Sequence, residues 1–407
     1  MRSSLALMAA VLSPLVSAIA IPSQEHVIVG YYPTWKHNEL ASLDLNKYTH
    51  INVAFAIPDE KAELKFDGDA HMSDIVSRAH TNNATKVLVS LGGWTGSIHF
   101  SNITKSPELS QTLTDNIIRM MTQHQLDGID IDWEFPGENG SPCNFVDETN
   151  DVKNFLVYLQ SLRTRIDETF TPEEKLITLA VRVKPFSGLG DTNLADFAKV
   201  VDFANIMAYD INGPWMDTTG PNAPLNFEQG KGTQLSFASS IDQWVESGWP
   251  ANQLTAGLAF YGHSLTSSVD MTLTDPPTQY EKKDGPVPKG ASTDEEATET
   301  CPENSAKPDH AGAKQYSGVW TYAQLRQEGA LDGPTTAKAP WVRAFDNVTM
   351  TPWLFQPENK TFVSYDDPIS VKIKTKFARS KGLRGVMLWD LAGDFQSELT
   401  KAINSKC

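Results

Sequence analysis

The most informative stretch of this chain is Asp127-Gly128-Ile129-Asp130-Ile131-Asp132-Trp133-Glu134. Within it, Asp130, Asp132 and Glu134 alternate with two isoleucines and a tryptophan. Alternate residues of a β-strand share a face, and a rise of about 3.3 Å per residue puts neighbours in such a row ~7 Å apart. We therefore predict a strand with three carboxylates on its inward face and an apolar face packed against helices.

Three carboxylates on one buried face predict acid catalysis. Like charges disfavour joint ionisation, so the three groups titrate together and hold at least one proton near neutral pH. A general acid at the end of a barrel strand needs such a proton. The alternatives are a solvated acidic edge strand and a divalent-metal site. The interleaved apolar residues argue against the first, and the lack of glycine-rich and asparagine-rich turns argues against the second. We expect no metal and no cofactor.

Seven other short segments have the apolar composition of strands buried on both faces. They are 26–32, 50–56, 86–92, 176–184, 203–209, 254–261 and 383–390. Helix-like stretches lie between many of them, and one opens with a cap residue and a proline at Ser106-Pro107-Glu108. The alternation predicts an α/β fold with a parallel sheet covered by helices, and eight strands predict a closed (β/α)8 TIM barrel.

The regular spacing breaks down between residues 263 and 367, a segment too long for an ordinary barrel connection. It holds a polar acidic tract, Lys282–Ala311, followed by Trp320, Trp341 and Trp353. We predict a small α+β domain inserted between strands 7 and 8, with a disordered loop as the alternative for the polar tract. The expected parts are barrel strands 1–7 in 21–264, the insertion in 265–367, and strand 8 with a C-terminal helix in 368–407.

The first twenty residues have the pattern of a signal peptide. Arg2 precedes an apolar run, Leu5 to Val16, that is too short to span a bilayer, and Ala18-x-Ala20 offers a cleavage site. A buried N-terminal helix is the alternative. We expect residues 1–20 to be removed and the protein to be secreted and extracellular.

Cysteines and glycosylation signals fit that compartment. Three cysteines, Cys143, Cys301 and Cys407, permit one disulfide, but the sequence does not fix which pair forms it, and three free thiols are the alternative. Five Asn-x-Ser/Thr tripeptides are candidate glycosylation sites. They begin at Asn83, Asn102, Asn139, Asn347 and Asn359.

The charge of the chain limits its partners. The 407 residues carry a formal net charge of -16, with a pI near 5.0. Such an acidic surface repels phosphate backbones and anionic lipid headgroups. We therefore expect no nucleic-acid and no membrane partner, and we expect a monomer that takes a neutral or weakly cationic substrate.

The acidic stretch resembles the signature of glycoside hydrolase family 18, the chitinases and their relatives, in the form Asp127-x-x-Asp130-x-Asp132-x-Glu134. The resemblance extends to the motifs of the other strands and to the insertion. The sequence of the insertion around 317–320 and 341–367 looks like that of secreted fungal members. The matching strand motifs are Gly30-Tyr31-Tyr32, Ala54-Phe55-Ala56, Ser90 to Trp94, Met207-Ala208-Tyr209-Asp210, Phe260-Tyr261-Gly262 and Gly385 to Asp390. One departure is His263, where many relatives carry an arginine.

The resemblance implies a chitinase acting on chitin or chitooligosaccharides, with the 2-acetamido oxygen of the substrate as nucleophile. Glu134 would be the acid and base. Asp132 would hold the acetamide N–H and share a proton with Asp130. Tyr209 would donate to the acetamide carbonyl, and Asp210 would contact the distorted sugar.

The resemblance also implies a set of substrate-binding residues. Trp389 would form the floor beneath the reacting sugar, and other side chains would line the cleft. The full set is Tyr31, Phe55, Trp94, Met207, Asp210, Tyr261 and Trp389. Each aromatic has a plain alternative as core packing, and Met207 is expected to pack below the site.

Other functions can use the same scaffold. A chitin-binding lectin would keep the aromatic residues and lose the acid, whereas Glu134 is present. An endo-β-N-acetylglucosaminidase acting on N-glycans would share the acidic motif, but those relatives generally lack a large insertion. A structural or inhibitory secreted protein has no need of three aligned carboxylates.

Overall fold

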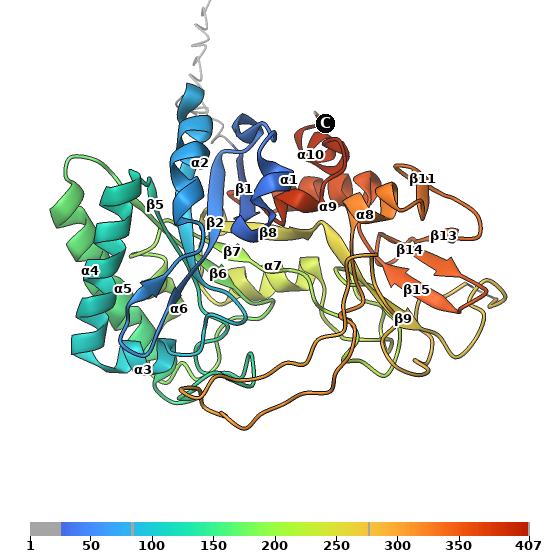
Figure 1. The fold of residues 1–407 in the computed structure, drawn as a ribbon, viewed down its shortest axis with the longest axis horizontal. Coiled ribbons are helices and arrows are strands. Elements are labelled where there is room, and N and C mark those ends of the chain that lie inside the picture. Colours follow the sequence, from blue (N-terminus) through green and yellow to red (C-terminus); the bar gives the residue numbers. More distant parts are fainter. Residues whose placement is uncertain (1–25, 83–84, 276, 406–407) are drawn as a thin grey trace, which may run out of the picture.

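Eight parallel strands close into a barrel in the computed structural model, which describes residues 26–82, 85–275 and 277–405 (Figure 1). The strands follow the order β1-β16-β8-β7-β6-β5-β4-β2, and pairing of β1 with β2 closes the ring. Their bounds are β1 Val27–Pro33, β2 His50–Pro58, β4 Lys86–Gly92, β5 Gly128–Asp132, β6 Leu176–Val181, β7 Phe203–Ile206, β8 Leu254–Ala259 and β16 Gly385–Trp389. The predicted TIM barrel is confirmed.

Several strands end earlier than the sequence predicts. We expected the acidic strand to continue to Glu134, but β5 ends at Asp132, where its pairing with β4 stops. Similarly, β6 stops at Val181 and β7 at Ile206. The residues that follow these strand ends therefore belong to loops at the carboxyl end of the barrel. In this fold, that end carries the functional residues.

Helices cover the outside of the barrel. The longest two are α4 Pro107–His124 and α5 Asp151–Phe170. As the sequence predicts, Ser106 caps α4 by accepting a hydrogen bond from the Leu109 N–H. The others are α1 His37–Leu40, α2 Met72–Ala79, α3 Phe100–Lys105, α6 Leu194–Phe197, α7 Phe237–Glu246, α9 Pro368–Ser380 and α10 Glu398–Asn404. No helix among the described residues is long and apolar enough to span a membrane.

A second, antiparallel sheet follows the seventh barrel strand, with the order β10-β9-β15-β14-β13. Its first strand, β9, begins at Tyr261, so the expected boundary between residues 264 and 265 falls inside it. The elements are β9 Tyr261–Thr266, β10 Val319–Thr321, α8 Tyr322–Gln327, β11 Leu331–Gly333, β12 Thr336–Ala337, β13 Val342–Asp346, β14 Thr351–Gln356 and β15 Thr361–Ser364. Trp320 and Trp353 are buried, and Trp341 packs edge-on against Trp320, so these tryptophans stabilise the insertion.

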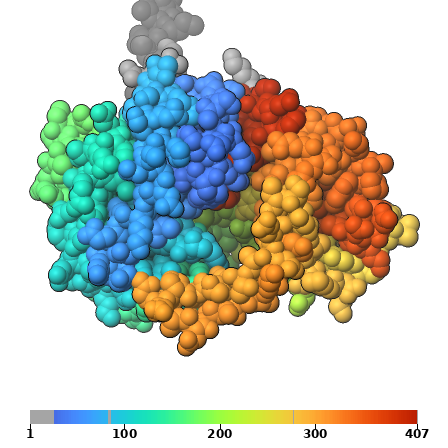
Figure 2. Space-filling view, viewed as in Figure 1, coloured from blue at the N-terminus to red at the C-terminus, as the bar shows by residue number. Residues whose placement is uncertain are grey.

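Much of the polar tract runs across the mouth of the barrel as a strap, which we define as residues 290–316. Isolated β-bridges pair Ala297 with Gln315 and Thr300 with Ala311. Figure 1 shows this orange segment leaving the inserted sheet and reaching the side of the barrel that carries α3. In Figure 2 it forms one edge of a hollow in the visible face.

A disulfide anchors the far end of the strap. Cys143 and Cys301 are joined with an S–S distance of 2.07 Å, and the third cysteine, Cys407, lies outside the described residues. The Asn304 side chain also donates to Glu60 at 2.5 Å. Both contacts hold the far end of the strap, and its other end continues into β10 of the inserted sheet. The predicted signal peptide, residues 1–20, lies outside the described residues too.

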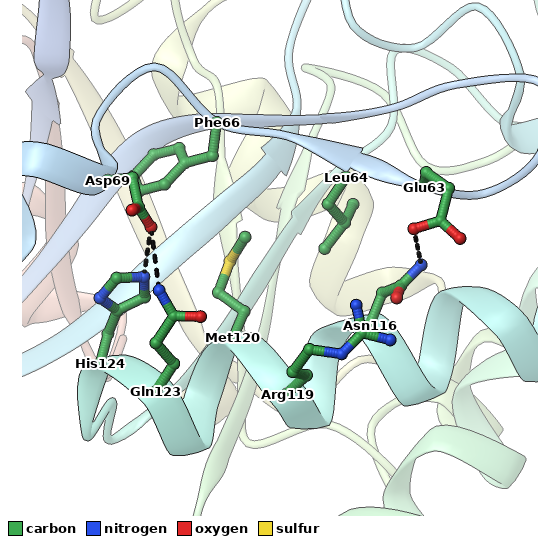
Figure 3. Close-up of a pocket in the computed structure, with 9 residues that line it drawn as sticks. All are labelled: Glu63, Leu64, Phe66, Asp69, Asn116, Arg119, Met120, Gln123 and His124. Atoms are coloured by element: carbon green, nitrogen blue, oxygen red, sulfur yellow. Dashed lines mark hydrogen bonds and ion pairs between the residues drawn. The ribbon is translucent and has the colours of Figure 1, made fainter.

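A groove of about 340 Å³ lies on the outer flank of the barrel, between α4 and the hairpin of β2 with β3 Leu64–Lys65 (Figure 3). Asp69 pairs with His124 at 2.8 Å across it, and Asn116 donates to Glu63 at 3.2 Å. None of the carboxylates of β5 lines this groove. Its polar pairs fasten the hairpin to α4.

Candidate active site

Asp130 is fully buried beneath the mouth of the barrel and accepts hydrogen bonds from residues of three other barrel strands, β1, β4 and β6. The donors are the hydroxyls of Tyr31 at 2.8 Å, Ser90 at 2.7 Å and Thr178 at 2.5 Å. Burial raises the pKa of Asp130, and these donors act in the opposite direction. The barrel thus fixes one carboxylate at the base of the row and surrounds it with hydrogen-bond donors.

Asp132, the next carboxylate of the row, is held in its protonated form. Burial raises the pKa of Asp132 well above its ordinary value, and the nearby charges of Glu134 and Asp130 raise it further. Its Oδ1 atom is buried without a hydrogen-bond partner among the residues that the structure describes. This unsatisfied atom is free to take a hydrogen bond from a ligand.

Glu134 lies just beyond the end of β5, and its backbone is fixed on both sides. Its N–H donates to the Ser97 hydroxyl at 2.9 Å, and its carbonyl accepts from the Asn144 side chain at 2.8 Å. Burial, followed by the charge of Asp210, raises the pKa of Glu134 to about 8. The carboxyl therefore carries a proton at neutral pH and is able to act as a general acid.

Tyr209 follows β7 and places its hydroxyl in the same region, 3.7 Å from the sulfur of Met387. Burial raises the pKa of Tyr209 well above its ordinary value, and the charges of Asp132 and Asp210 add to the effect. The phenol therefore stays protonated and is available as a hydrogen-bond donor.

Two cavities meet at Glu134. The inner cavity, of about 220 Å³, is lined by Tyr31, Phe55, Trp94, Asp132, Glu134, Met207, Tyr209, Asp210, Tyr261 and Trp389. The outer cavity, of about 440 Å³, is lined by Trp94, Glu134, Phe135, Arg182, Val183, Met207, Tyr209, Asp210 and Trp215. The structure thus brings all of the sequence-predicted site residues together around the inner cavity, except Asp130, which lies below it.

The aromatic residues of the inner cavity differ in exposure. Trp94 is 46% exposed, whereas Tyr31 is 2% exposed. The ring of Phe55 stacks on Trp389 with centroids 5.6 Å apart, and Tyr31 packs against the same tryptophan. Trp94 is therefore free to contact a ligand, whereas Tyr31 acts mainly through its packing and through its hydroxyl on Asp130.

Sequence reasoning missed several residues at the mouth. Trp35 is 60% exposed beside Trp389, and Trp215 is 58% exposed in the outer cavity. Arg182, also in the outer cavity, forms an ion pair with Glu138. The available signal was position, because each follows the carboxyl end of a barrel strand: Trp35 follows β1, Arg182 follows β6 and Trp215 follows β7. Exposed tryptophans beside or within these cavities offer flat apolar faces to a ligand.

The donor set does not suggest a metal centre. No group of three or more histidine, cysteine or acidic side chains is arranged to hold a metal ion in the described part of the chain. Asp130 accepts hydrogen bonds from three hydroxyls, and burial raises the pKa of Asp132 and of Glu134. The arrangement is suited to giving a proton to, and taking a proton from, a ligand that occupies the two cavities.

These features define a class, the TIM-barrel proteins with a proton-holding carboxylate row at the carboxyl end of the fourth strand. The sequence model described as glycosyl hydrolases family 18 matches residues 27–394. The chain belongs to glycosyl hydrolase family 18.

Relatives whose names contain the word chitinase align with most of this chain. A chitinase-like effector of Moniliophthora roreri is 32% identical over 389 residues, covering 92% of this chain and 91% of that protein. Chitinase A1 of Niallia circulans is 26% identical over 449 residues, covering 95% of this chain and 59% of that protein. A crystal structure of a chitinase from Rhizomucor miehei superposes with a TM-score of 0.81 at 31% identity, covering 93% of this chain and 98% of that one.

Proposed function

We propose that this protein is a secreted chitinase that hydrolyses β-1,4 linkages between N-acetylglucosamine units. The observation that carries the proposal is the position of Glu134, a carboxyl with a pKa of about 8 where the two cavities meet. A glycosidic oxygen between the cavities would lie within reach of its proton. The family and the names of the relatives support the substrate class.

The nucleophile in this proposal is the acetamido oxygen of the substrate. A conventional retaining glycosidase needs a second, ionised carboxylate. Asp132 faces the inner cavity, but burial raises its pKa well above the ordinary value, which makes it a poor nucleophile. The acetamido oxygen of the sugar in the inner cavity instead attacks C1, while Glu134 gives its proton to the departing oxygen.

The second half of the reaction regenerates the acid. After the C1–O bond to the leaving sugar breaks, the first sugar is a positively charged oxazolinium with a bond between C1 and the acetamido oxygen. The Glu134 carboxylate then takes a proton from water, and the resulting hydroxide forms the new bond to C1 as the oxazolinium opens. Attack from the same face as the departed sugar retains the β configuration.

Neighbouring groups would stabilise the intermediate. The unpaired Oδ1 of Asp132 would accept the acetamide N–H, and ionisation of Asp132 with transfer of its proton toward Asp130 would offset the positive charge. The Tyr209 hydroxyl, held protonated by burial, would donate to the acetamide oxygen. Trp389 would support the sugar ring from below.

The outer elements suggest how longer chains are held. Trp35 and Trp215 would give sugar rings flat contacts at the two ends of the cleft. The strap would add a wall across the mouth, anchored at Cys301 and Asn304. We propose that the enzyme grips a single chitin chain and releases mainly the dimer.

Secretion and glycosylation belong to the same proposal. The Cys143–Cys301 disulfide suits an oxidising compartment. The asparagines of the four sequons within the described residues, Asn102, Asn139, Asn347 and Asn359, are all exposed. The test is N-terminal sequencing of the secreted protein, which should begin at Ile21, together with a mass shift on deglycosylation.

The first test of the activity is the variant Glu134→Gln. It should fold and bind chitin oligomers, and its turnover should fall by on the order of 10²–10⁴-fold, the usual contribution of a positioned acid. Oligosaccharide products are quantified by chromatography for the wild type and the variant. Near wild-type turnover by the variant would remove Glu134 from this role.

A second candidate is a protein that binds chitin oligomers without cleaving them. Two relatives are named "chitinase-like effector", and this name supports the second candidate. The wild type is therefore assayed on chitin oligomers beside a high-mannose glycoprotein. Binding without turnover would support the second candidate, and release of N-glycans alone would indicate an endo-β-N-acetylglucosaminidase.

A further inference from the structure

Asn144 lies in the loop between β5 and α5, and its side chain is bonded directly to the backbone of Glu134. Its Nδ2 atom donates to the Glu134 carbonyl oxygen at 2.8 Å, and the residue is only 6% exposed. The loop passes so close that a Cβ atom at Gly140 would clash with the same carbonyl oxygen. The N–H of Phe145 donates to the Ile98 carbonyl at 3.0 Å, which joins this loop to the loop that precedes α3. Asn144 is therefore held in a fixed place beside the acid.

The amide of Asn144 contributes little to the stability of the fold. Its Oδ1 atom is buried and has no hydrogen-bond partner among the residues that the structure describes. Leaving a buried polar atom unpaired costs at least as much as one hydrogen bond contributes. An amide with its oxygen and nitrogen exchanged would place Oδ1 against the Glu134 carbonyl oxygen, so that carbonyl fixes the orientation of the side chain. A polar residue buried at such a cost is expected at a functional position.

The hydrogen bonds between Glu134 and the described residues run through its backbone and not through its carboxyl group. Besides the bond from Asn144 to its carbonyl, its N–H donates to the hydroxyl of Ser97, a fully buried residue. That hydroxyl also lies within hydrogen-bond distance of the Gly93 and Asp132 carbonyl oxygens, at 2.9 Å and 3.2 Å. Two side chains thus hold the peptide groups on both sides of the Glu134 Cα atom, and the backbone sets the direction of the carboxyl group.

The acid needs a fixed direction because it lies beyond the end of the strand, where the two cavities meet. The pairing of β5 with β4 stops at Asp132, so no strand partner holds residue 134. A proton donor must lie within about 3 Å of the departing oxygen, and a misplacement of about 1 Å can lower the rate on the order of 10²-fold. Ser97 and Asn144 replace the missing strand pairing.

We infer that Asn144 is a positioning residue that, through the Glu134 carbonyl, directs the acid toward the glycosidic oxygen between the two cavities. This inference rests on the proposed function for its catalytic consequence. The hydrogen bond between Asn144 and Glu134 does not depend on that function.

The test compares two substitutions at Asn144 with a matched control in the same loop. Asn144→Leu keeps a branched side chain and removes the donor, and Asn144→Asp keeps the shape but has no donor when ionised. The control is Asn150→Leu, because Asn150 is exposed and its side chain donates to Asp147. Both Asn144 variants should bind chitin oligomers with nearly unchanged KM and lose about 10–100-fold in kcat. The control should keep both values close to those of the wild type.

Substrates with different leaving groups separate positioning of the acid from a general loss of structure. A dinitrophenyl group departs without a proton, whereas the leaving sugar of a chitin oligomer needs the proton of Glu134. The value of kcat/KM reports the steps up to the first bond cleavage. For Asn144→Leu it should fall by about 10–100-fold on the oligomer and by less than about threefold on the dinitrophenyl glycoside of the N-acetylglucosamine dimer. A merely structural role predicts equal losses on the two substrates.

Crystal structures of the variants supply a readout that needs no turnover. The Glu134 carboxyl group should be displaced, or occupy more than one position, in Asn144→Leu but not in Asn150→Leu. Equal losses on the two substrates, an unmoved Glu134, or failure of both Asn144 variants to fold would overturn the inference. Absence of turnover by the wild type on chitin oligomers would instead refute the proposed function, while the crystal structures still decide whether Asn144 holds Glu134.

Discussion

Replacing Glu134 by glutamine is expected to stabilise the fold at neutral and alkaline pH, although it removes the proposed acid. Burial and the charge of Asp210 raise the pKa of Glu134 from 4.5 to about 8. The fold therefore favours the protonated carboxyl. Its contribution to stability is fully present below pH 4.5 and is lost as the pH rises to 8.

The size of this loss follows from the same values. At about 1.4 kcal/mol for each pH unit between 4.5 and 8, the loss reaches about 3 kcal/mol at pH 7 and about 5 kcal/mol at pH 8. These are upper bounds, because water in the cavities screens part of the charge. Glutamine has the same shape and does not ionise, so the variant avoids the loss.

The assay is equilibrium unfolding in urea at pH 4.5 and pH 8. Glu134→Gln should be about 2–4 kcal/mol more stable than the wild type at pH 8 and nearly equal to it at pH 4.5. Glu358→Gln, at an exposed residue of the inserted domain, is the matched control and should change little at either pH. If Glu134→Gln behaves like this control at pH 8, the account of a buried, protonated Glu134 is wrong.

Two further predictions concern the strap and a buried ion pair of α9. Cys301→Ser removes one anchor of the strap. The assay follows the viscosity of a soluble long-chain chitin derivative and the number of reducing ends released. For each reducing end released, Cys301→Ser should lower the viscosity more than the wild type and the control variant Cys407→Ser do. Turnover of a short chromogenic substrate should be unchanged. Equal viscosity loss would refute a wall across the mouth. Lys374 and Asp366 form a buried ion pair at 2.7 Å, so Lys374→Met should cost about 3–5 kcal/mol in urea unfolding. The double variant Lys374→Met, Asp366→Leu should recover most of that loss, and no recovery would contradict the argument from an unpaired charge.

The carboxylate row could be predicted because its information is local. Asp130, Asp132 and Glu134 alternate with apolar residues within one short stretch, and the period of two of the expected strand places them on one face. The motif did not reveal where the strand ends. Pairing of β5 with β4 stops at Asp132, which leaves Glu134 in the loop where it faces both cavities.

Other features depend on contacts between distant segments and could not be predicted in this way. The disulfide joins cysteines 158 residues apart, and only the path of the strap brings them together. His263 could be identified as a departure from the family pattern, but its bond to Asp210 and its unpaired Nδ1 atom required the structure. Trp215 was missed because its loop carries no periodic pattern.

The anomeric form of the first product tests the central claim most directly. The wild type is mixed with a chitin oligomer, and the anomeric protons of the new reducing end are followed by ¹H NMR before mutarotation equilibrates them. Attack by the acetamido oxygen, with Glu134 as acid and then base, predicts that the β-anomer appears first. Initial formation of the α-anomer, or no cleavage at all, would contradict the account.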